Sequence, residues 1–306
     1  MSASSSTGVV LALVSAASFS VTGTFAHSLT DAGWTPGAAV AARVGCAAVI
    51  LLVPALIALQ GRWALLRRRL PTIAIYGLVT VAGCQVCYFN AISHLSVGVA
   101  LLLEYLGIVL IVGYLWVRRG QRPRRLTVIG SVLALAGLAL VIDLVGGVSL
   151  DPIGVLWALG GAVGLATYFM ISGNTDDEVP PLVLAAGGMI VGALSLIALG
   201  AFGMLPMHAT FGTVPFAGHR IGWWVPVAVV SLIGAALAYV AGIGAARRLG
   251  PRLASFLGLT EVVFAILVAW WLLGELPTGL QLAGGALILA GVVLVRLDEA
   301  PVRLPS

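Results

Sequence analysis

The chain has 306 residues, of which 60% are hydrophobic and 9% are charged, and its mean hydropathy is +1.12. A soluble globular domain carries about 25% charged residues, so this composition excludes a soluble protein and predicts an all-α integral membrane protein. The formal net charge of +5 comes from arginines in the connections between apolar runs, which are expected to anchor loops and not to bind nucleic acid.

Ten apolar runs follow one another along the chain, each long enough to form a membrane span. A spanning helix needs about 20 mostly apolar residues. Prolines lie at or near the starts of many runs, where the missing N–H costs little. The first run is followed by no cleavage pattern, so we expect it to be retained as a span. The predicted spans are residues 7–29, 36–59, 70–93, 97–117, 124–143, 152–172, 181–203, 223–246, 250–273 and 278–296.

The positions of the arginines predict the orientation of the chain. Every arginine except Arg43 and Arg220 lies in or beside a connection that follows an even-numbered span. Because arginine accumulates in cytoplasmic loops, we expect a multi-pass protein of the inner cell membrane with both termini in the cytoplasm. The connection 174–180 should share that side, but it departs from the rule with Asp176, Asp177 and Glu178 and no arginine.

The second half of the chain repeats the first. Residues 254–295, shifted back by 154 positions, are identical to residues 100–141 at a third of the positions, and a weaker match sets residues 8–17 against 154–163. The repeating unit therefore has five spans, in residues 7–143 and 152–296. An odd number of spans inserts upside down the second time, which predicts two inverted five-helix repeats around a central cavity, the symmetry that alternating access uses.

A pattern of Glu, Leu-Gly-Glu, Gln-Leu-x-Gly and Ala-Gly runs through residues 260–295. It resembles the carboxy-terminal half of an EamA domain, the repeat unit of the drug/metabolite transporter superfamily. In two places the chain departs from the family: Val262 stands where a proline is usual, so the kink often found there is not implied, and Gln121 replaces the loop glutamate of the first half. Residues 100–107, ALLLEYLG, are similar to a motif of the threonine/homoserine exporter branch. The residues on the EamA pattern are Glu261, Gly274, Glu275, Gln281, Leu282, Gly284, Ala290 and Gly291.

Three charged residues, Arg43, Glu104 and Glu261, fall inside predicted spans. Each costs about 2.5–3.5 kcal/mol at the centre of a span on insertion scales, so each should face protein or water. Arg43 and Glu104 lie at comparable depth and could form an ion pair that only holds the first half together. They could instead contact a zwitterionic or charged substrate, or a carboxylate could carry a proton. Glu261 has no obvious partner, and a helix–helix hydrogen bond is its alternative role.

Uncharged polar residues recur at helical spacing in several spans. The resemblance places these spans around a central cavity, so we expect the polar residues to line it; hydrogen bonds between helices are the alternative for each one. As a set they predict a polar lumen. The candidates are Ser18, Thr22, Gln85, Tyr88, Asn90, Tyr168 and Tyr239.

The sequence gives little support for enzyme activity or for metal binding. The sequence has no phosphate-binding loop of the Walker type, no His-Glu-x-x-His and no Gly-x-Ser-x-Gly, so we expect neither ATP hydrolysis nor another enzyme activity. The four histidines lack the spacing of metal ligands, and Cys46, Cys84 and Cys87 lie in apolar runs where a disulfide is not expected. We therefore predict no metal and no cofactor.

These features together predict a secondary transporter of small polar metabolites that works by alternating access, and the resemblance favours an amino-acid or related metabolite exporter. The partners expected are a small-molecule substrate and the lipid bilayer; protons as the coupling ion and a homodimer stay open. The alternatives are a facilitative channel-like pore or a drug or cation efflux protein, and more remotely an intramembrane enzyme or a lipid-handling protein.

Overall fold

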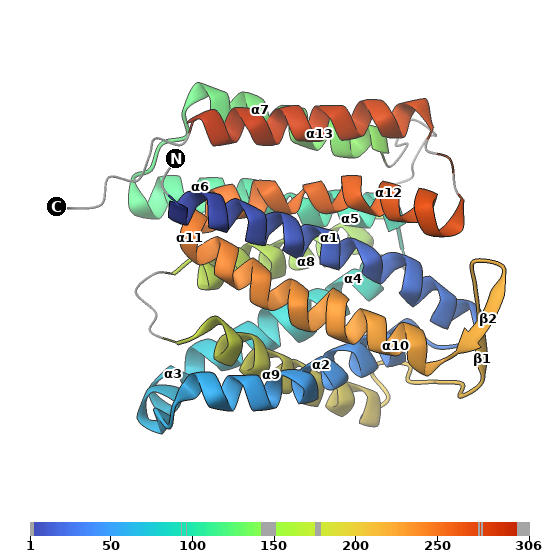
Figure 1. Cartoon of the computed structure of the whole chain (residues 1–306). Coiled ribbons are helices and arrows are strands. Elements are labelled where there is room, and N and C mark those ends of the chain that lie inside the picture. The colour runs from blue at the N-terminus through green and yellow to red at the C-terminus, as the bar shows by residue number, and fades with distance from the viewer. Residues whose placement is uncertain are drawn as a thin grey trace.

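The computed structural model describes residues 3–92, 94–95, 97–141, 151–174, 179–274, 276 and 278–298, and in them the chain is almost entirely helical (Figure 1). Eight helical stretches among these residues are long and apolar enough to cross a membrane. Two further apolar helices, Arg125–Leu140 and Thr260–Leu272, are shorter. The described residues therefore form a multi-pass helical protein, as the composition predicts.

Local sequence explains where the helices of the first half begin and end. Thr35 caps the second helix, because its Oγ1 accepts a hydrogen bond from the N–H of Ala38 at 3.4 Å, and Pro36 follows at the first helical position. The same helix ends at Gln60, which adopts a left-handed conformation. The elements of this half are α1 (Ala3–Asp31), α2 (Pro36–Leu59), α3 (Trp63–Ile75), the π-helical η1 (Tyr76–Gly83), α4 (Cys84–Ile92), α5 (Val97–Tyr105), α6 (Gly107–Arg119) and α7 (Arg125–Val141).

The second half starts at another capped helix. The carboxylate of Asp151 accepts a hydrogen bond from the N–H of Ile153 at 2.9 Å and lies 2.8 Å from Nδ1 of His94. These two contacts hold the pKa of Asp151 below its ordinary value. The elements are α8 (Pro152–Ser172), α9 (Pro181–Ala201), β1 (Thr213–Phe216), β2 (His219–Gly222), α10 (Trp224–Ser231), the π-helical η3 (Leu232–Leu237), α11 (Ala238–Gly258), α12 (Thr260–Leu273) and α13 (Gly279–Asp298).

The structure departs from the sequence-based prediction in three places. The runs predicted at 97–117 and 250–273 are each broken near the middle, at Leu106 and at Leu259. The predicted boundary between the eighth and ninth runs is present, because Gly250 (φ 80°, ψ 162°) is not helical and kinks the stretch that continues to Gly258. The connection at 204–222 contains an antiparallel hairpin, which the all-α prediction did not include. Ala217 and Gly218 both take positive φ in its turn, as a tight hairpin requires.

Several local features recur 154 positions apart. The segment η1, shifted by 154, covers residues 230–237 and so contains η3. Gly120 ends α6 and Gly274 ends α12, both in the left-handed region with φ of 66° and 71°. Equivalent helices also pack against each other, α2 against α9 and α7 against α13. The backbone thus repeats features that the sequence match alone covers only in part.

The helices lie in layers, with α7 and α13 side by side at one edge (Figure 1). Their contact depends on glycine: a Cβ built on Gly137 would lie 2.5 Å from the carbonyl oxygen of Gly284. Next to this pair lie α5, α6, α12, α1 and α11, and α2 and α9 pack together at the opposite edge. The largest buried cluster joins α2, η1, α8 and α9, around Tyr76 and Met189.

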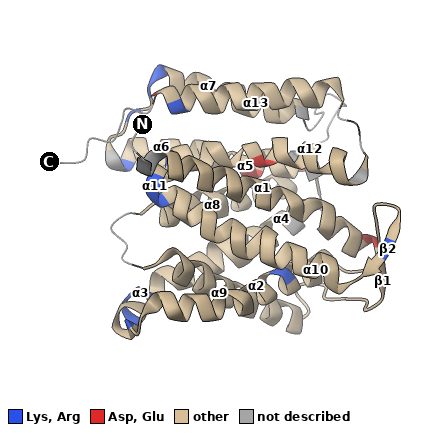
Figure 2. Cartoon of the chain, viewed as in Figure 1, with Lys and Arg blue, Asp and Glu red and all other residues tan. Residues whose placement is uncertain are grey.

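The two ends of the bundle differ in charge (Figure 2). We call one the hairpin end; it carries β1, β2 and the turn at Gly33. The other we call the arginine end, which carries the connections with Arg62, Arg67, Arg68, Arg118, Arg122, Arg124, Arg125, Arg247, Arg248 and Arg252.

Candidate functional site

A cavity of about 810 Å³ lies between α1, α2, η1, α4, α5, α8, α11 and α12. Its volume lies in the range of sites that bind small molecules. Much of the wall is apolar, but the three charged residues that the sequence places inside spans, Arg43, Glu104 and Glu261, all line it. The structure therefore brings together charges that are distant in sequence.

Arg43 on α2 joins two helices across the cavity. Its Nη2 donates a hydrogen bond of 2.5 Å to the carbonyl oxygen of Gly234 in η3, and its guanidinium carbon lies 5.9 Å from the centre of the Phe19 ring, within the range of a cation–π contact. The Nε atom is buried without a hydrogen-bond partner. Arg43 thus lines the cavity with a guanidinium whose Nη2 is bonded to the backbone and whose Nε is shielded from solvent.

The Arg43–Glu104 ion pair considered from the sequence does not form. In the described part of the chain the ion pairs are His27 with Asp31 and His94 with Asp151. The charged side chain that interacts electrostatically with Arg43 is instead Glu261. Equal depth in two neighbouring spans did not specify the partner, because the direction of each side chain depends on how the helices rotate.

Glu104 lies near the end of α5, close to α8. The thiol of Cys84 donates a weak hydrogen bond to its Oε1 at 3.3 Å. Gly161 of α8 lies directly beside it, since a Cβ there would lie 3.4 Å from Cγ of Glu104, an ordinary van der Waals contact. The helix breaks just beyond, at Leu106, and Gly107 then packs on α8 so closely that a Cβ would lie 2.6 Å from the carbonyl oxygen of Ala162.

Glu261 lies in the first turn of α12, because the chain breaks at Leu259. The unpaired N–H groups at a helix start favour a carboxylate at that position. The hydroxyl of Tyr105 donates to its Oε2 at 3.4 Å. From the sequence this residue has no obvious partner, whereas the structure places Tyr105 and Arg43 beside it.

Aromatic rings form the wall towards the arginine end. The rings of Phe19 and Tyr239 are 5.2 Å apart, and Tyr168 lies 5.5 Å from Tyr239 and 4.8 Å from Phe169. Tyr168 is possible here only because residue 242 is glycine: a Cβ at Gly242 would collide with its hydroxyl. These edge-to-face contacts make a rigid apolar wall with polar tips.

Eight of the ten residues predicted from the sequence line the cavity: Thr22, Arg43, Gln85, Tyr88, Glu104, Tyr168, Tyr239 and Glu261. The other two, Ser18 and Asn90, are not among the lining residues. Ser18 is buried, and the amide of Asn90 donates to the carbonyl oxygen of Val86 on its own helix. Sequence reasoning missed the lining residues Phe19, Thr80, Cys84, Tyr105 and Phe169. Only Tyr105 carried a signal, as the polar neighbour of Glu104.

Several polar atoms on the cavity wall have no hydrogen-bond partner. They are Oγ1 of Thr22, Oγ1 of Thr80 and Nε of Arg43. A buried polar group without a partner costs about 1–3 kcal/mol. A polar ligand or water inside the cavity would remove that cost.

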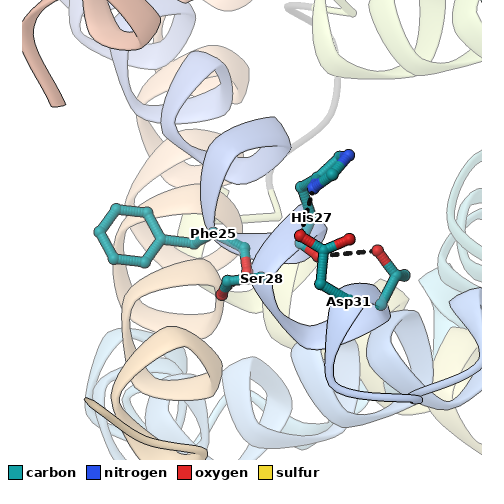
Figure 3. A network of polar contacts seen from close by, with 5 residues as sticks. Phe25, His27, Ser28 and Asp31 are labelled. Atoms are coloured by element: carbon teal, nitrogen blue, oxygen red, sulfur yellow. Dashed lines mark hydrogen bonds and ion pairs between the residues drawn. The ribbon is translucent and has the colours of Figure 1, made fainter. Parts of the chain in front are cut away.

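The cavity reaches the surface at the hairpin end. His27 and Thr30 line it there, and the His27 side chain is 76% exposed. Figure 3 shows His27 and Asp31 on one side of α1, with Nδ1 2.9 Å from Oδ2, and Phe25 pointing to the other side. Phe25 stacks on Phe216 of β1 at 4.4 Å, so the hairpin is fixed beside this opening.

Tight contacts close the arginine end. A Cβ on Gly8 of α1 would lie 2.9 Å from the Leu249 side chain, and one on Gly173 would lie 2.8 Å from Cδ of Pro251. Helices meet there with no room for a side chain between them.

Metal binding finds no support in the described residues, since no group of three or more His, Cys, Asp or Glu side chains is placed to hold an ion. Some residues considered from the sequence lie outside the described part: Asp176, Asp177 and Glu178 of the acidic connection, and Glu275 of the EamA pattern.

The sequence matches the EamA-like transporter family over residues 6–143 and again over residues 152–297. The chain belongs to the EamA-like transporter family. A solved crystal structure superposes on this EamA-like protein with a TM-score of 0.76, over 95% of this chain and 97% of that one, at 22% identity. That likeness supports the fold alone.

Three curated relatives of this EamA-like transporter extend the comparison. A probable terminal-alkyne amino-acid exporter of Streptantibioticus cattleyicolor is 30% identical over 74% of this chain and 73% of its own length. An uncharacterized transporter of Archaeoglobus fulgidus is 27% identical over 74% of this chain and 76% of its own length. The threonine/homoserine exporter RhtA of Salmonella typhimurium is 27% identical over 73% of this chain and 70% of its own length. The resemblance stated from the sequence is confirmed: the chain is a membrane transporter of this family.

Proposed function

We propose that this EamA-like transporter is a secondary transporter that exports amino acids or closely related small zwitterions by alternating access. Its ten predicted spans would form two inverted five-helix repeats. Counting ten requires α7 and α12 to span although they are short; Gly250 would then lie at the boundary between the eighth and ninth spans. The features that recur 154 positions apart support this arrangement, which alternating access exploits.

The cavity's charges carry the proposal. A carboxylate on the substrate would meet Arg43, whose Nε is unpaired, and an ammonium group would meet Glu104 or Glu261. The unpaired oxygens of Thr22 and Thr80 would complete hydrogen bonds to the same polar head. Buried charges are tolerated in a membrane where they bind a substrate or one another, and a zwitterion supplies both signs at once.

The relatives support a zwitterionic substrate, since two of them are described as exporters of amino acids. With both termini in the cytoplasm, the hairpin end would face outward and the structure would be an outward-open state. The closed contacts at the arginine end, Gly8 on Leu249 and Gly173 on Pro251, count against a continuous channel-like pore.

One alternative has an observation in its favour. Two carboxylates beside the rings of Phe19, Tyr88, Tyr168 and Tyr239 would also suit an organic cation, as in drug efflux. Arg43 argues against it, because its positive charge in the same cavity would repel a ligand that has no anionic group.

Counterflow in proteoliposomes tests the proposal. Vesicles are loaded with unlabelled L-threonine and given labelled L-threonine outside, with a panel of amino acids and one tetraalkylammonium cation as competitors. We expect accumulation that amino acids suppress and the cation does not. Accumulation suppressed by the cation alone would favour cation efflux, and equilibration without accumulation would indicate a pore.

A further inference from the structure

The charges that line the cavity do not balance one another. In the described part of the chain, its lining residues include two carboxylates, Glu104 and Glu261, and one guanidinium, Arg43. His27 lines it only at the mouth, where its ring pairs with Asp31 (Figure 3). A zwitterionic substrate has no net charge and would leave one carboxylate unbalanced. Because a buried charge in a membrane is costly without a partner, that carboxylate requires a proton or a second cationic group on the ligand.

The two carboxylates belong to different parts of the cavity wall. Glu261 is the acid that interacts electrostatically with Arg43, and Tyr105 donates to its Oε2 at 3.4 Å. Glu104 instead lies against α4 and α8, where the thiol of Cys84 donates to its Oε1 at 3.3 Å. A head group bound between Arg43 and Glu261 would therefore leave Glu104 unused.

Further polar groups line the cavity beside Glu104. Thr80, Cys84 and Tyr88 are four residues apart along η1 and α4, so they lie on one side of this helical stretch, and all three line the cavity. Oγ1 of Thr80 is buried without a hydrogen-bond partner, and Tyr88 interacts electrostatically with Glu104. Gln85 lines the cavity next to Cys84. We call Glu104, Thr80, Gln85 and Tyr88 the α4 subsite.

The α4 subsite is rich in hydrogen-bond acceptors. A primary ammonium group has three N–H donors and no acceptor. The carboxylate of Glu104, the hydroxyl oxygen of Thr80 and the amide oxygen of Gln85 supply three acceptors, and the ring of Tyr88 adds a face for the same cation. A proton on Glu104 would balance its charge but would supply nothing to Thr80. The chemistry of the subsite therefore favours an ammonium group over a proton.

We propose that the α4 subsite, centred on Glu104, binds an ammonium group on the side chain of the substrate, so that basic amino acids are the preferred substrates. This inference rests on the proposed transport function, to which it adds the substrate class. The head group would bind between Arg43 and Glu261, and the side chain would reach across the cavity, whose volume of about 810 Å³ has room for it. Such a substrate has a net charge of one, which balances the excess carboxylate.

L-lysine and L-norleucine test the subsite, because they have the same carbon chain and differ in the terminal ammonium group. Each competes with labelled L-threonine in counterflow by the unaltered chain, and its half-inhibitory concentration is measured. We expect lysine to inhibit at a concentration about tenfold or more below that of norleucine, the effect of one added hydrogen bond to a charged group. Equal inhibition by the two would overturn the subsite and leave the transport function standing.

Variants locate the effect in the cavity. Glu104→Gln should raise the half-inhibitory concentration of lysine by about tenfold, close to that of norleucine, and Thr80→Val should raise it by about threefold. Inhibition by norleucine should change by less than about twofold in both. Asp31→Asn is the control, since it removes a carboxylate at the mouth and not in the subsite, and it should keep the preference for lysine.

Binding measured without transport serves a variant that is too slow for counterflow. Lysine or norleucine is added to the purified protein in detergent, and the rise in the thermal unfolding midpoint reports binding. Lysine should raise the midpoint of the unaltered chain more than norleucine does, and Glu104→Gln should remove the difference. A Glu104→Gln variant that keeps the preference for lysine, or that weakens both ligands equally, would overturn the subsite. Absence of counterflow by the unaltered chain with any amino acid would overturn the proposed function, and with it this inference.

Discussion

Two π-helical segments, η1 and η3, occupy equivalent positions in the two halves, yet different polar groups lie at them. In η3 the carbonyl oxygen of Gly234 accepts a hydrogen bond from Arg43. In η1 the residue 154 positions earlier is Thr80, whose Oγ1 has no partner. The same π-helical feature thus meets a cation in one half and carries a buried threonine hydroxyl in the other.

The carboxylates show the same contrast. Glu104 corresponds to Gly258, and Glu261 corresponds to Gly107. Both glycines allow close packing, Gly107 against Ala162 and Gly258 against Phe169. The two halves share the helix breaks at Leu106 and Leu259 and the helix-ending glycines Gly120 and Gly274, and these features belong to the scaffold. Where they differ, charged groups enter the cavity, so the two halves should respond unequally to substitution in the site and equally in the scaffold.

The largest effect is expected at Arg43. Arg43→Ala should reduce counterflow by a hundredfold or more, about what the loss of one member of a buried charged pair costs, because Gly234 loses its donor and Glu261 its cation. Ile197→Ala, a substitution of an exposed residue on α9, the helix equivalent to α2, should leave counterflow near normal. Equal damage by the two variants, with both still monodisperse in detergent, would break the proposed asymmetry.

The two carboxylates should give the next largest effect. Glu104→Gln and Glu261→Gln should each slow counterflow by about tenfold or more, since each removes a charged hydrogen-bond acceptor from the cavity. Glu261→Gln should be the more damaging, because Arg43 depends on Glu261 for charge balance and not on Glu104. Counterflow across a series of pH values measures both. If both variants keep normal transport and its pH dependence, carboxylates take no part in the mechanism.

Much of this fold could be predicted from the sequence, because membrane spans depend on long apolar runs and helix ends depend on local proline and glycine. Pro36 and Gly120 were predictable in this way. The breaks at Leu106 and Leu259 and the segments η1 and η3 were not, since they follow from how neighbouring helices pack. The break at Leu259 also decides the environment of Glu261, which lies at a helix start and not in the middle of a span.

The candidate site was partly predictable for the same reason. Charge inside a span is costly wherever it occurs, so Arg43, Glu104 and Glu261 could be chosen without knowing the packing. Which of these three residues face each other could not be predicted from the sequence. Small polar residues carry a weaker signal, because Ser18 and Thr22 lie on the same helix and only Thr22 lines the cavity.

Glycines between α7 and α13 test whether the two halves share the same helix-packing scaffold. Gly137 and Gly291 are equivalent, and a Cβ on either would lie 2.5 Å from a carbonyl oxygen of the partner helix, Gly284 and Gly130 respectively. Overpacking of this kind costs about 1–3 kcal/mol, so Gly137→Ala and Gly291→Ala should lower the thermal unfolding midpoint by a similar few degrees. Gly113→Ala is the control, since nothing lies within 4 Å of the added Cβ. A large difference between the two equivalent variants would contradict a shared scaffold.

The smallest effect is expected at Asp151, a difference between the halves that lies outside the cavity. Its carboxylate caps α8 through the N–H of Ile153 and contacts His94, and both contacts lower its pKa. A lowered pKa in the folded state means that the carboxylate stabilises the protein above its ordinary pKa and that this contribution is lost as the pH falls through the folded value. Asp151→Ala should therefore lower the unfolding midpoint slightly at neutral pH and by less in acid, where the unaltered protein also loses the cap. Asp151→Asn, which keeps a capping oxygen, should recover much of the difference, and counterflow should stay normal in both variants. A loss of transport without a loss of stability would show that the asymmetry at this end of the molecule is functional as well.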